Sequence, residues 1–178
     1  MQDRTQNLLG AFALDVAGRI QRETEAAIGH TGATAAALVT IAQFPQQTVE
    51  ELRQAIGLSH PAAVRVVDRL AAGKLVRRRP AGRGPAVALT ATAAGRRKAR
   101  AILDIRRAIL ADALPVLSDE ESATLTAILE RALAHLADSP DPVICRLCDT
   151  GRCRRSECPV MERQTQRGNP PPEFVPLD

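Results

Sequence analysis

The chain has 178 residues, with 24 Lys and Arg against 20 Asp and Glu, and a formal net charge of +4. Hydrophobic residues make up 45% of it but aromatic residues only 2%, which predicts a core of aliphatic side chains and alanine on closely packed helices. No run is apolar over the length of about 18 residues that a membrane span needs, and the N-terminus lacks a signal-peptide pattern, so we expect a cytoplasmic protein without a membrane partner. Phosphate-cradling glycine loops and nucleophile–base pairs are also absent, and we expect no enzymatic activity.

Three helices are predicted in the first third of the chain. Residues 5–28 carry apolar side chains at three- and four-residue steps, which is typical of an amphipathic helix ending at Gly29. A second helix is predicted over 33–43, before Pro45. A third is predicted over 48–56, where Thr48 and Glu51 have the spacing of a capping box and Gly57 ends the helix.

The next segment predicts a helix and a hairpin. Ser59 is the expected N-cap of a helix over 60–72, and Pro61 is tolerated in its first turn. Two short strands at 75–79 and 86–90 flank a loop with two glycines and two prolines. This order is that of a winged helix-turn-helix, with the helix-turn-helix at about 48–72 and the wing at 75–90. In such a motif the second of the two helices, here 60–72, enters the DNA major groove.

Two further helices and a different C-terminal region follow. A long helix is predicted over 91–113, up to Pro115, and a last one over 118–137, which opens with the capping box of Ser118 and Glu121. The composition then changes. Residues 143–161 hold all four cysteines, and 162–178 are Pro-rich and polar, which predicts a disordered tail.

Positive charge is concentrated around the helix predicted over 60–72 and around the wing. Between Arg65 and Arg100 lie eleven basic residues and a single acidic one, Asp68, a net +10 within a chain of +4. This is the pattern of a face that binds phosphates, so we expect double-stranded DNA as the partner. Asp68 is interpreted as a structural partner for a wing or helix arginine.

The side chains expected at the DNA lie on the helix over 60–72, at the helix caps and on the first strand of the wing. Arg65 is the candidate for a bidentate contact to guanine, with a phosphate contact as the equal alternative. Thr48 and Ser59 are candidates for phosphate contacts besides their capping roles. The full set of candidates, with one wing residue discussed below, is Thr48, Ser59, His60, Ala62, Ala63, Arg65, Arg69, Arg77, Arg78, Arg79 and Arg83.

Three runs stand out: LSHPAAVRVVDRLAAGKLVRR at 58–78, LTATAAGRR at 89–97 and LSDEE at 117–121. Together they resemble the MarR family of bacterial transcriptional regulators. The resemblance covers about residues 5–137 and implies a mainly α fold with a small β-wing. It also implies a homodimer with intertwined N- and C-terminal helices, acting as a repressor on a pseudo-palindrome. Many relatives bind small aromatic effectors, so such an effector is a further candidate partner.

The wing departs from the family pattern in one respect. The family commonly carries an Asp-x-Arg-Asp type motif there, whereas this chain has Ala81-Gly82-Arg83-Gly84. Arg83 matches the arginine of the motif, and the resemblance implies a place for it in the minor groove. The acidic residues that would brace it are missing.

The cysteines form a compact cluster outside the family pattern. Their spacing, Cys145-x2-Cys148-x4-Cys153-x4-Cys158, indicates metal or redox chemistry in a cytosolic protein. A four-cysteine zinc site is the first interpretation, because it would order a segment with few apolar residues. An iron–sulfur cluster and a thiol–disulfide switch remain open as alternatives.

Two other functions fit parts of the sequence. The helices could be only a dimer scaffold for a metal- or redox-sensing cluster, or the chain could be an architectural DNA-binding protein without regulation. The concentrated positive charge favours the DNA-binding regulator over the first of these.

Overall fold

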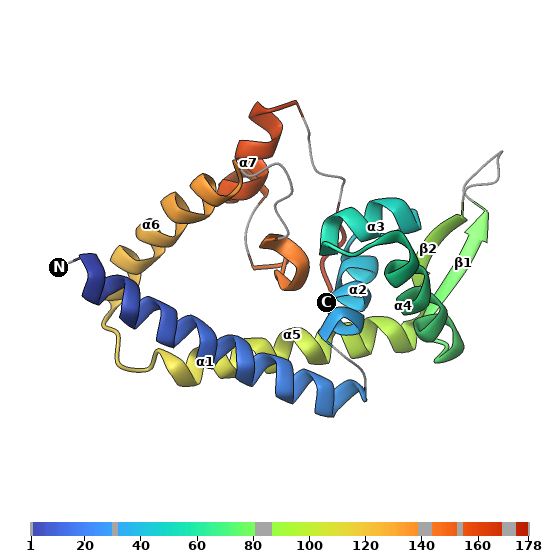
Figure 1. The fold of residues 1–178 in the computed structure, drawn as a ribbon, viewed down its shortest axis with the longest axis horizontal. Coiled ribbons are helices and arrows are strands. Elements are labelled where there is room, and N and C mark those ends of the chain that lie inside the picture. Colours follow the sequence, from blue (N-terminus) through green and yellow to red (C-terminus); the bar gives the residue numbers. More distant parts are fainter. Residues whose placement is uncertain are drawn as a thin grey trace.

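The computed structural model describes residues 2–29, 32–80, 87–138, 144–152, 155–168 and 174–177. Figure 1 shows α2, α3, α4 and the two-stranded hairpin gathered at one end, with α1 and α5 side by side along the long axis and α6 and α7 towards the other end. The elements are α1 (Gln2–Ile28), α2 (Gly32–Gln43), α3 (Val49–Ile56), α4 (His60–Ala72), β1 (Val76–Pro80), β2 (Val87–Ala91), α5 (Ala93–Ala113), α6 (Asp119–Leu136), the 3-10 turns η1 (Ile144–Leu147) and η2 (Arg155–Glu157), and α7 (Pro159–Gln166). The predicted fold class, mainly α with a small β-wing, is confirmed.

Helix α2 forms the centre of the core. Every residue of α2 from Thr34 to Gln43 is buried, and α1, α3, α4, α5, β2 and η1 all pack against it. Its sequence, GATAAALVTIAQ, is apolar on all sides, so the helix has no face suited to water. Small alanines allow the neighbouring helices to approach, while Leu38 and Ile41 fill the space between them.

Local signals place the two helices of the helix-turn-helix. Thr48 caps α3 with the predicted capping box, and Gly57 ends that helix in the left-handed region at φ 69°. Leu52 and Ile56 of α3 and Val67 and Leu70 of α4 are buried against the same core. The turn between the helices therefore fixes the angle at which α4 presents its opposite face to solvent.

The hairpin is antiparallel, with Val76 opposite Ala91 and Arg78 opposite Leu89. Side chains alternate between the faces of a strand, so Val76, Leu89 and Ala91 face the core while Arg77 lies on the other face. The base of the hairpin is joined to α5, because the Thr92 backbone N–H donates to the Leu75 carbonyl at 2.9 Å.

Two helices keep large apolar side chains in water. On α1, Leu8, Leu9 and Phe12 are 50%, 59% and 39% exposed. Within α6, which is described along its whole length, no residue is buried, and Ile128, Leu129 and Leu136 are exposed. A single chain leaves both amphipathic faces without a partner. None of the described helices has the combination of length and apolar character needed to cross a bilayer.

The C-terminal region differs from its prediction. Disorder is predicted for 162–178, whereas α7 continues to Gln166 and residues 174–177 lie against the core. The rings of Phe174 and Phe44 meet edge to face at 6.3 Å, and the Val175 N–H donates to the Gln43 carbonyl at 2.7 Å. These contacts depend on a surface that α2 and its neighbours provide, and composition does not reveal them.

Gly95 permits the close contact between α5 and the hairpin. A Cβ at this position would lie 2.0 Å from the Leu75 carbonyl oxygen, which belongs to the backbone and cannot move aside. We therefore expect Gly95→Ala to lower the free energy of unfolding by at least about 1–3 kcal/mol, the usual cost of overpacking. Chemical denaturation followed by circular dichroism measures the change.

Gly73→Ala is the matched control. Its φ is −73°, and the nearest atom to an added Cβ is the Arg69 carbonyl oxygen at 3.5 Å, an ordinary contact. This variant should keep nearly the wild-type stability. Equal stability of the two variants would show that the close contact at Gly95 is not present in solution.

Candidate nucleic-acid interface

Helix α4 has one buried and one exposed face. Ala63, Val66, Val67 and Leu70 are buried, and Arg65 lies on the exposed side. The prediction that Ala63 contacts DNA is therefore wrong: its side chain has no exposed surface, because it packs inward with the apolar residues of the helix. Ala62, next to it in the sequence, is partly exposed and remains a candidate.

The arginines of α4 have different surroundings. Arg65 is exposed and makes no hydrogen bond or ion pair to another described residue, so its guanidinium is available to a ligand. Arg69 is also exposed, but its Nη1 lies 3.4 Å from the Thr34 hydroxyl of α2. Of the two arginines, Arg65 thus has the fewer contacts among the described residues, and its contact to a base or a phosphate stays a prediction.

The predicted structural role of Asp68 is confirmed. Arg78 Nη2 of β1 donates to Asp68 Oδ1 at 2.7 Å, which ties the first strand of the wing to α4. The pair is largely exposed and contributes at most about 1 kcal/mol, so its main effect is on position. Arg77 and Arg79, on the other face of the strand, are exposed and make no ion pair within the described part of the chain.

The two predicted caps behave differently. The Glu51 N–H donates to Thr48 Oγ1 at 3.2 Å, and the Thr48 N–H donates to Glu51 Oε2 at 2.6 Å, so the capping box is formed. Ser59 occupies the N-cap position of α4, but its side chain accepts no capping hydrogen bond. Its exposed hydroxyl therefore stays available at the end of α4 that faces solvent.

His60 lies beside an ionised network at the start of α4. Its Nδ1 is 3.6 Å from Glu50 Oε2, and Arg53 donates to both oxygens of the same carboxylate at 2.7 and 2.6 Å. The hydrogen bonds from Arg53 hold the pKa of Glu50 below its usual range. His60 remains a predicted DNA contact, since its ring is exposed. Arg83 lies outside the described residues.

The basic surface continues from α4 to the start of α5. A pocket of about 420 Å³ lies where the end of α4, β1 and the first turn of α5 meet, and Lys74, Arg77 and Thr92 are among its lining residues. Thr92 caps α5 by accepting from the Gly95 N–H at 3.0 Å. Two cationic side chains and a helix N-terminus favour an anion at this position.

The structure places two of the four cysteines together. Cys145 lies in η1 and Cys148 directly follows that turn, and the Cys148 N–H donates to the Cys145 carbonyl at 3.0 Å. The Cys145 thiol hydrogen-bonds to the sulfur of Cys148, and this bond, aided by the charge of Arg106, lowers the Cys148 pKa to about 6. Cys158 occupies the N-cap position of α7, and Cys153 lies outside the described residues.

The predicted metal site stays a prediction. Among the residues that the structure describes, no three His, Cys, Asp or Glu side chains come together as a metal-binding group. Sequence reasoning missed Gln43, which anchors the cysteine segment. Its Nε2 donates to the Cys148 carbonyl at 2.9 Å, and its Oε1 accepts from the Thr150 N–H at 2.8 Å. The only available signal was a lone amide at the end of an apolar helix.

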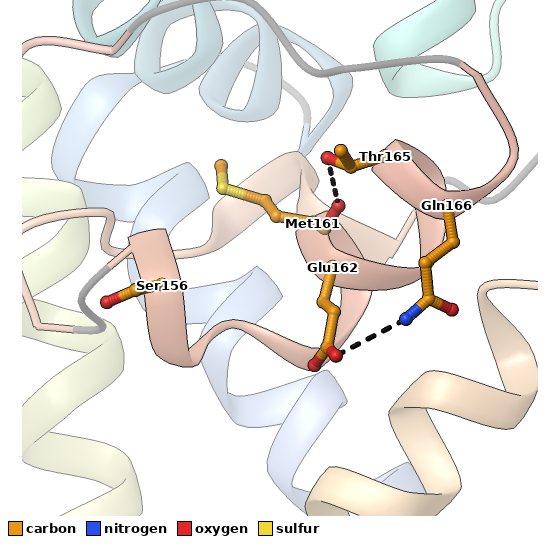
Figure 2. Close-up of a pocket in the computed structure, with 5 residues that line it drawn as sticks. All are labelled: Ser156, Met161, Glu162, Thr165 and Gln166. Carbon is orange, nitrogen blue, oxygen red and sulfur yellow. Dashed lines mark hydrogen bonds between the residues drawn. The ribbon is translucent and has the colours of Figure 1, made fainter.

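A second pocket, of about 580 Å³, lies on α7 and η2 (Figure 2). Figure 2 shows that its polar groups largely satisfy each other: Thr165 Oγ1 donates to the Met161 carbonyl at 2.9 Å, and Gln166 Nε2 donates to Glu162 Oε1 at 3.3 Å. Ser156 completes the lining.

Comparisons with known proteins agree with the geometry. Residues 28–84 match the model of the MarR family. The YusO protein of Bacillus subtilis is 24% identical, with a TM-score of 0.61 over 74% of this chain and 95% of that one. FabT of Streptococcus pneumoniae, solved in complex with DNA, is 16% identical, with a TM-score of 0.69 over 78% and 99%. No curated protein matches the chain.

A third structure was solved with a small molecule. The MarR family protein Rv2887 of Mycobacterium tuberculosis, in complex with p-aminosalicylic acid, is 26% identical, with a TM-score of 0.53 over 70% of this chain and 97% of that one. In each case most of the solved chain is matched, whereas about a quarter of this chain or more lies outside the match.

The two caps give a test of the interface geometry. We expect Thr48→Ala to lower the free energy of unfolding by about 0.5–2 kcal/mol, because it removes a formed capping box. Ser59→Ala should leave stability almost unchanged, since the Ser59 side chain makes no capping hydrogen bond. Thermal unfolding of both variants makes the comparison, and a larger loss in Ser59→Ala would contradict the arrangement of α4.

Proposed function

We propose that this chain is a MarR-family winged helix-turn-helix protein and a homodimeric repressor, which binds a pseudo-palindromic DNA site through α4 and the wing. The match of residues 28–84 to the MarR family model and the likeness to FabT, which was solved in complex with DNA, support a DNA-binding regulator. The observation that carries the proposal is the exposed face of α4, which carries Arg65, on a helix that packs against the basic strand β1.

The charge distribution supports DNA as the partner. The net +10 between Arg65 and Arg100 falls on α4, the hairpin and the first half of α5, which are neighbours in space. Arg65 can meet a base edge from the major groove, while Arg77 and Arg79 can meet phosphates on the outer face of the wing. The ion pair between Arg78 Nη2 and Asp68 Oδ1, at 2.7 Å, holds the first strand of the wing against α4.

The unpaired helices support a homodimer. Apolar side chains on α1 and α6 are left in water by a single chain, and a second copy offers the same two faces in return. A two-fold axis would then pair them in an isologous interface and set two α4 helices about 34–36 Å apart, one turn of DNA. A DNA site read by such a dimer is a pseudo-palindrome.

A small aromatic acid is the proposed effector class. Rv2887 was solved with p-aminosalicylic acid and with salicylic acid, which motivates the same chemistry here. An effector that binds one arrangement of the two α4 helices better than another shifts the population between them and changes DNA affinity. Titration of the DNA complex with salicylate, with benzene as the uncharged control, examines this part of the proposal.

Selection of duplexes from a random library, followed by anisotropy at several salt concentrations, tests the function as a whole. We expect a pseudo-palindromic consensus and a log–log salt slope of several units, because each phosphate contact contributes about 0.9. Binding without any consensus would indicate an architectural protein. No salt-dependent binding would overturn the proposal and favour the cysteine segment as the main activity.

Arg65 and Arg77 should differ in what they contribute. We expect Arg65→Ala to weaken binding to the selected duplex by about 1–3 kcal/mol, the value of a bidentate base contact, with a much smaller effect on random DNA. Arg77→Ala should weaken both alike and reduce the salt slope by about 0.9. Equal losses on both duplexes in Arg65→Ala would assign Arg65 to a phosphate instead.

Leu129 provides a test of the dimer. A charge placed on the exposed apolar face of α6 would be buried in the interface, so we expect Leu129→Lys to yield monomers and to lose operator affinity by more than tenfold. Ala127→Lys is the matched control on the same helix, because a 3.6-residue turn places it about 160° away from Leu129. Sedimentation measures the mass. A dimeric Leu129→Lys would contradict the proposed interface.

A further inference from the structure

The chain beyond α6 touches two separate parts of the fold. Among the elements that the structure describes, α7 is the one with an extensive contact to α6, whereas η1 packs against α2 and α3 of the winged part, by which we mean α2, α3, α4, β1 and β2. Figure 1 shows α7 beside one end of α6 and the C-terminus beside α2. We call η1, Thr150, α7 and residues 174–177 together the C-terminal brace. It is placed to hold α6 in a fixed position relative to the winged part.

Gln43 anchors the first half of the brace to the winged part. Its side chain is buried at the end of α2, where Nε2 donates to the Cys148 carbonyl at 2.9 Å. The Gln43 Oε1 accepts from the Thr150 N–H at 2.8 Å and from the Thr150 hydroxyl at 2.7 Å. Leu147 of η1 also packs against the core. Moving this segment away would leave a buried amide without partners, so the anchor resists displacement.

Residues 174–177 form a second anchor at the same end of α2. The Val175 N–H donates to the Gln43 carbonyl at 2.7 Å, and the rings of Phe174 and Phe44 meet edge to face at 6.3 Å. Both contacts are made by residues beyond α7 to the last turn of α2 and the residue that follows it. The brace thus returns to the winged part after it has touched α6.

A separate anchor holds α7 to the end of α6. Arg163 of α7 donates through Nε and Nη2 to the two oxygens of Asp138, at 2.6 and 3.0 Å, and Arg167 donates to the Asp138 carbonyl. The hydrogen bonds from Arg163 hold the pKa of Asp138 below its usual range. Val160 and Met161 of the same helix are buried. Helix α7 is therefore attached to α6 by polar and apolar contacts.

The stretches of chain between these anchors are short. Five residues, 139–143, separate Asp138 from η1, and another five, 169–173, separate Gly168 from Phe174. Even a fully extended chain of this length spans only about 20–22 Å. Both ends of each stretch are held by the contacts above, so α6 cannot move far from the winged part.

The winged part responds to the brace as one body. The Gln46 N–H, just beyond α2, donates to the Leu89 carbonyl of β2 at 2.9 Å, and the Leu89 N–H donates to the Gln47 carbonyl at 2.9 Å. The end of α2 that the brace contacts is therefore tied to the wing. Buried residues of α3 and α4 share the core with α2. The position of the brace on α2 thus determines the position of α4.

We propose that the C-terminal brace holds α4 at one distance from α6 and thereby makes the dimer selective for one spacing between the two half-sites of its DNA. The proposal rests on the homodimeric function proposed above. With α6 at the two-fold interface, the distance from α6 to α4 sets the separation of the two α4 helices. One base pair added between the half-sites moves them apart by about 3.4 Å and rotates one by about 35°. A braced dimer cannot follow this change.

Titrations by anisotropy test the selectivity, using the selected duplex and versions with one base pair added or removed between the half-sites. We expect the wild-type protein to bind the altered duplexes about tenfold more weakly, because protein or DNA must deform. Phe174→Ala, which removes the ring contact at α2, and Arg163→Ala, which removes the pair with Asp138, should each reduce this ratio by about threefold.

Two matched variants control for nonspecific effects. Val175→Ala shortens an exposed side chain but keeps its backbone hydrogen bond to α2. Arg152→Ala removes the same charge as Arg163→Ala but lies outside the anchors, where its ion pair to Asp149 is local. Both should keep the wild-type ratio between the duplexes. The same reduction in these controls as in the anchor variants would overturn the proposal.

The distance itself is measured within one chain and without DNA. Spin labels attached through ketone amino acids at Ala72 of α4 and Ala127 of α6, both exposed, report it by double electron–electron resonance. Labelled chains are diluted with unlabelled protein, so that each dimer carries one labelled chain. We expect a narrow distribution in the wild-type background and a broader one with Phe174→Ala or Arg163→Ala. Equal widths would show that the brace does not fix α4 and would overturn the proposal.

The outcomes separate the two proposals. Specific DNA binding without a preferred spacing, or with the same preference in the anchor variants as in the wild-type protein, overturns the selectivity and leaves the proposed function standing. Absence of specific DNA binding in the wild-type protein overturns both. A lost spacing preference together with a broadened distance distribution in both anchor variants is the result that the brace predicts.

Discussion

The burial of α2 is the constraint on which the rest of the fold depends. A helix that is apolar on every side must be covered on every side, and here α1, α3, α4, α5, β2 and η1 provide the cover. This single requirement orients the helix-turn-helix, the base of the wing and the long helix α5 around one axis. Fully burying one leucine such as Leu38 contributes about 1.5–3 kcal/mol, so the arrangement has a substantial driving force.

The same helix also recruits the C-terminal segment. Gln43 is a polar residue at the buried end of α2, and leaving its amide unpaired would cost about 1–3 kcal/mol for each lost group. Thr150 and the carbonyl of Cys148 satisfy it, and the rings of Phe174 and Phe44 close the adjacent surface. The segments around Thr150 and Phe174, which the sequence places outside the winged-helix domain, are thus part of the packing around α2.

Local patterns were enough to predict most of the helical framework. The Thr48 and Ser118 capping boxes, the glycines at the helix ends and the alternation in the hairpin are short-range signals, and the six predicted helices and the wing are present. The pairing of Asp68 with a wing arginine was also predictable from its isolation among basic residues.

The errors come from contacts between distant parts of the chain. Ala63 sits next to candidate DNA contacts in sequence, but its helical phase turns it inward. The turns η1 and η2, helix α7 and the docking of Phe174 depend on surfaces that exist only after α2 and α6 are in place. Periodicity and composition do not report such contacts, and a polar, proline-rich sequence is then interpreted as disorder.

The central claim is that a dimer presents two copies of α4 to successive major grooves of DNA. Hydroxyl-radical and methylation footprinting of the selected duplex tests it most directly. The account predicts two protected major-groove windows related by a two-fold axis, with centres about 10 base pairs apart, and loss of guanine N7 protection in Arg65→Ala. A single window, or protection confined to the minor groove, would contradict it.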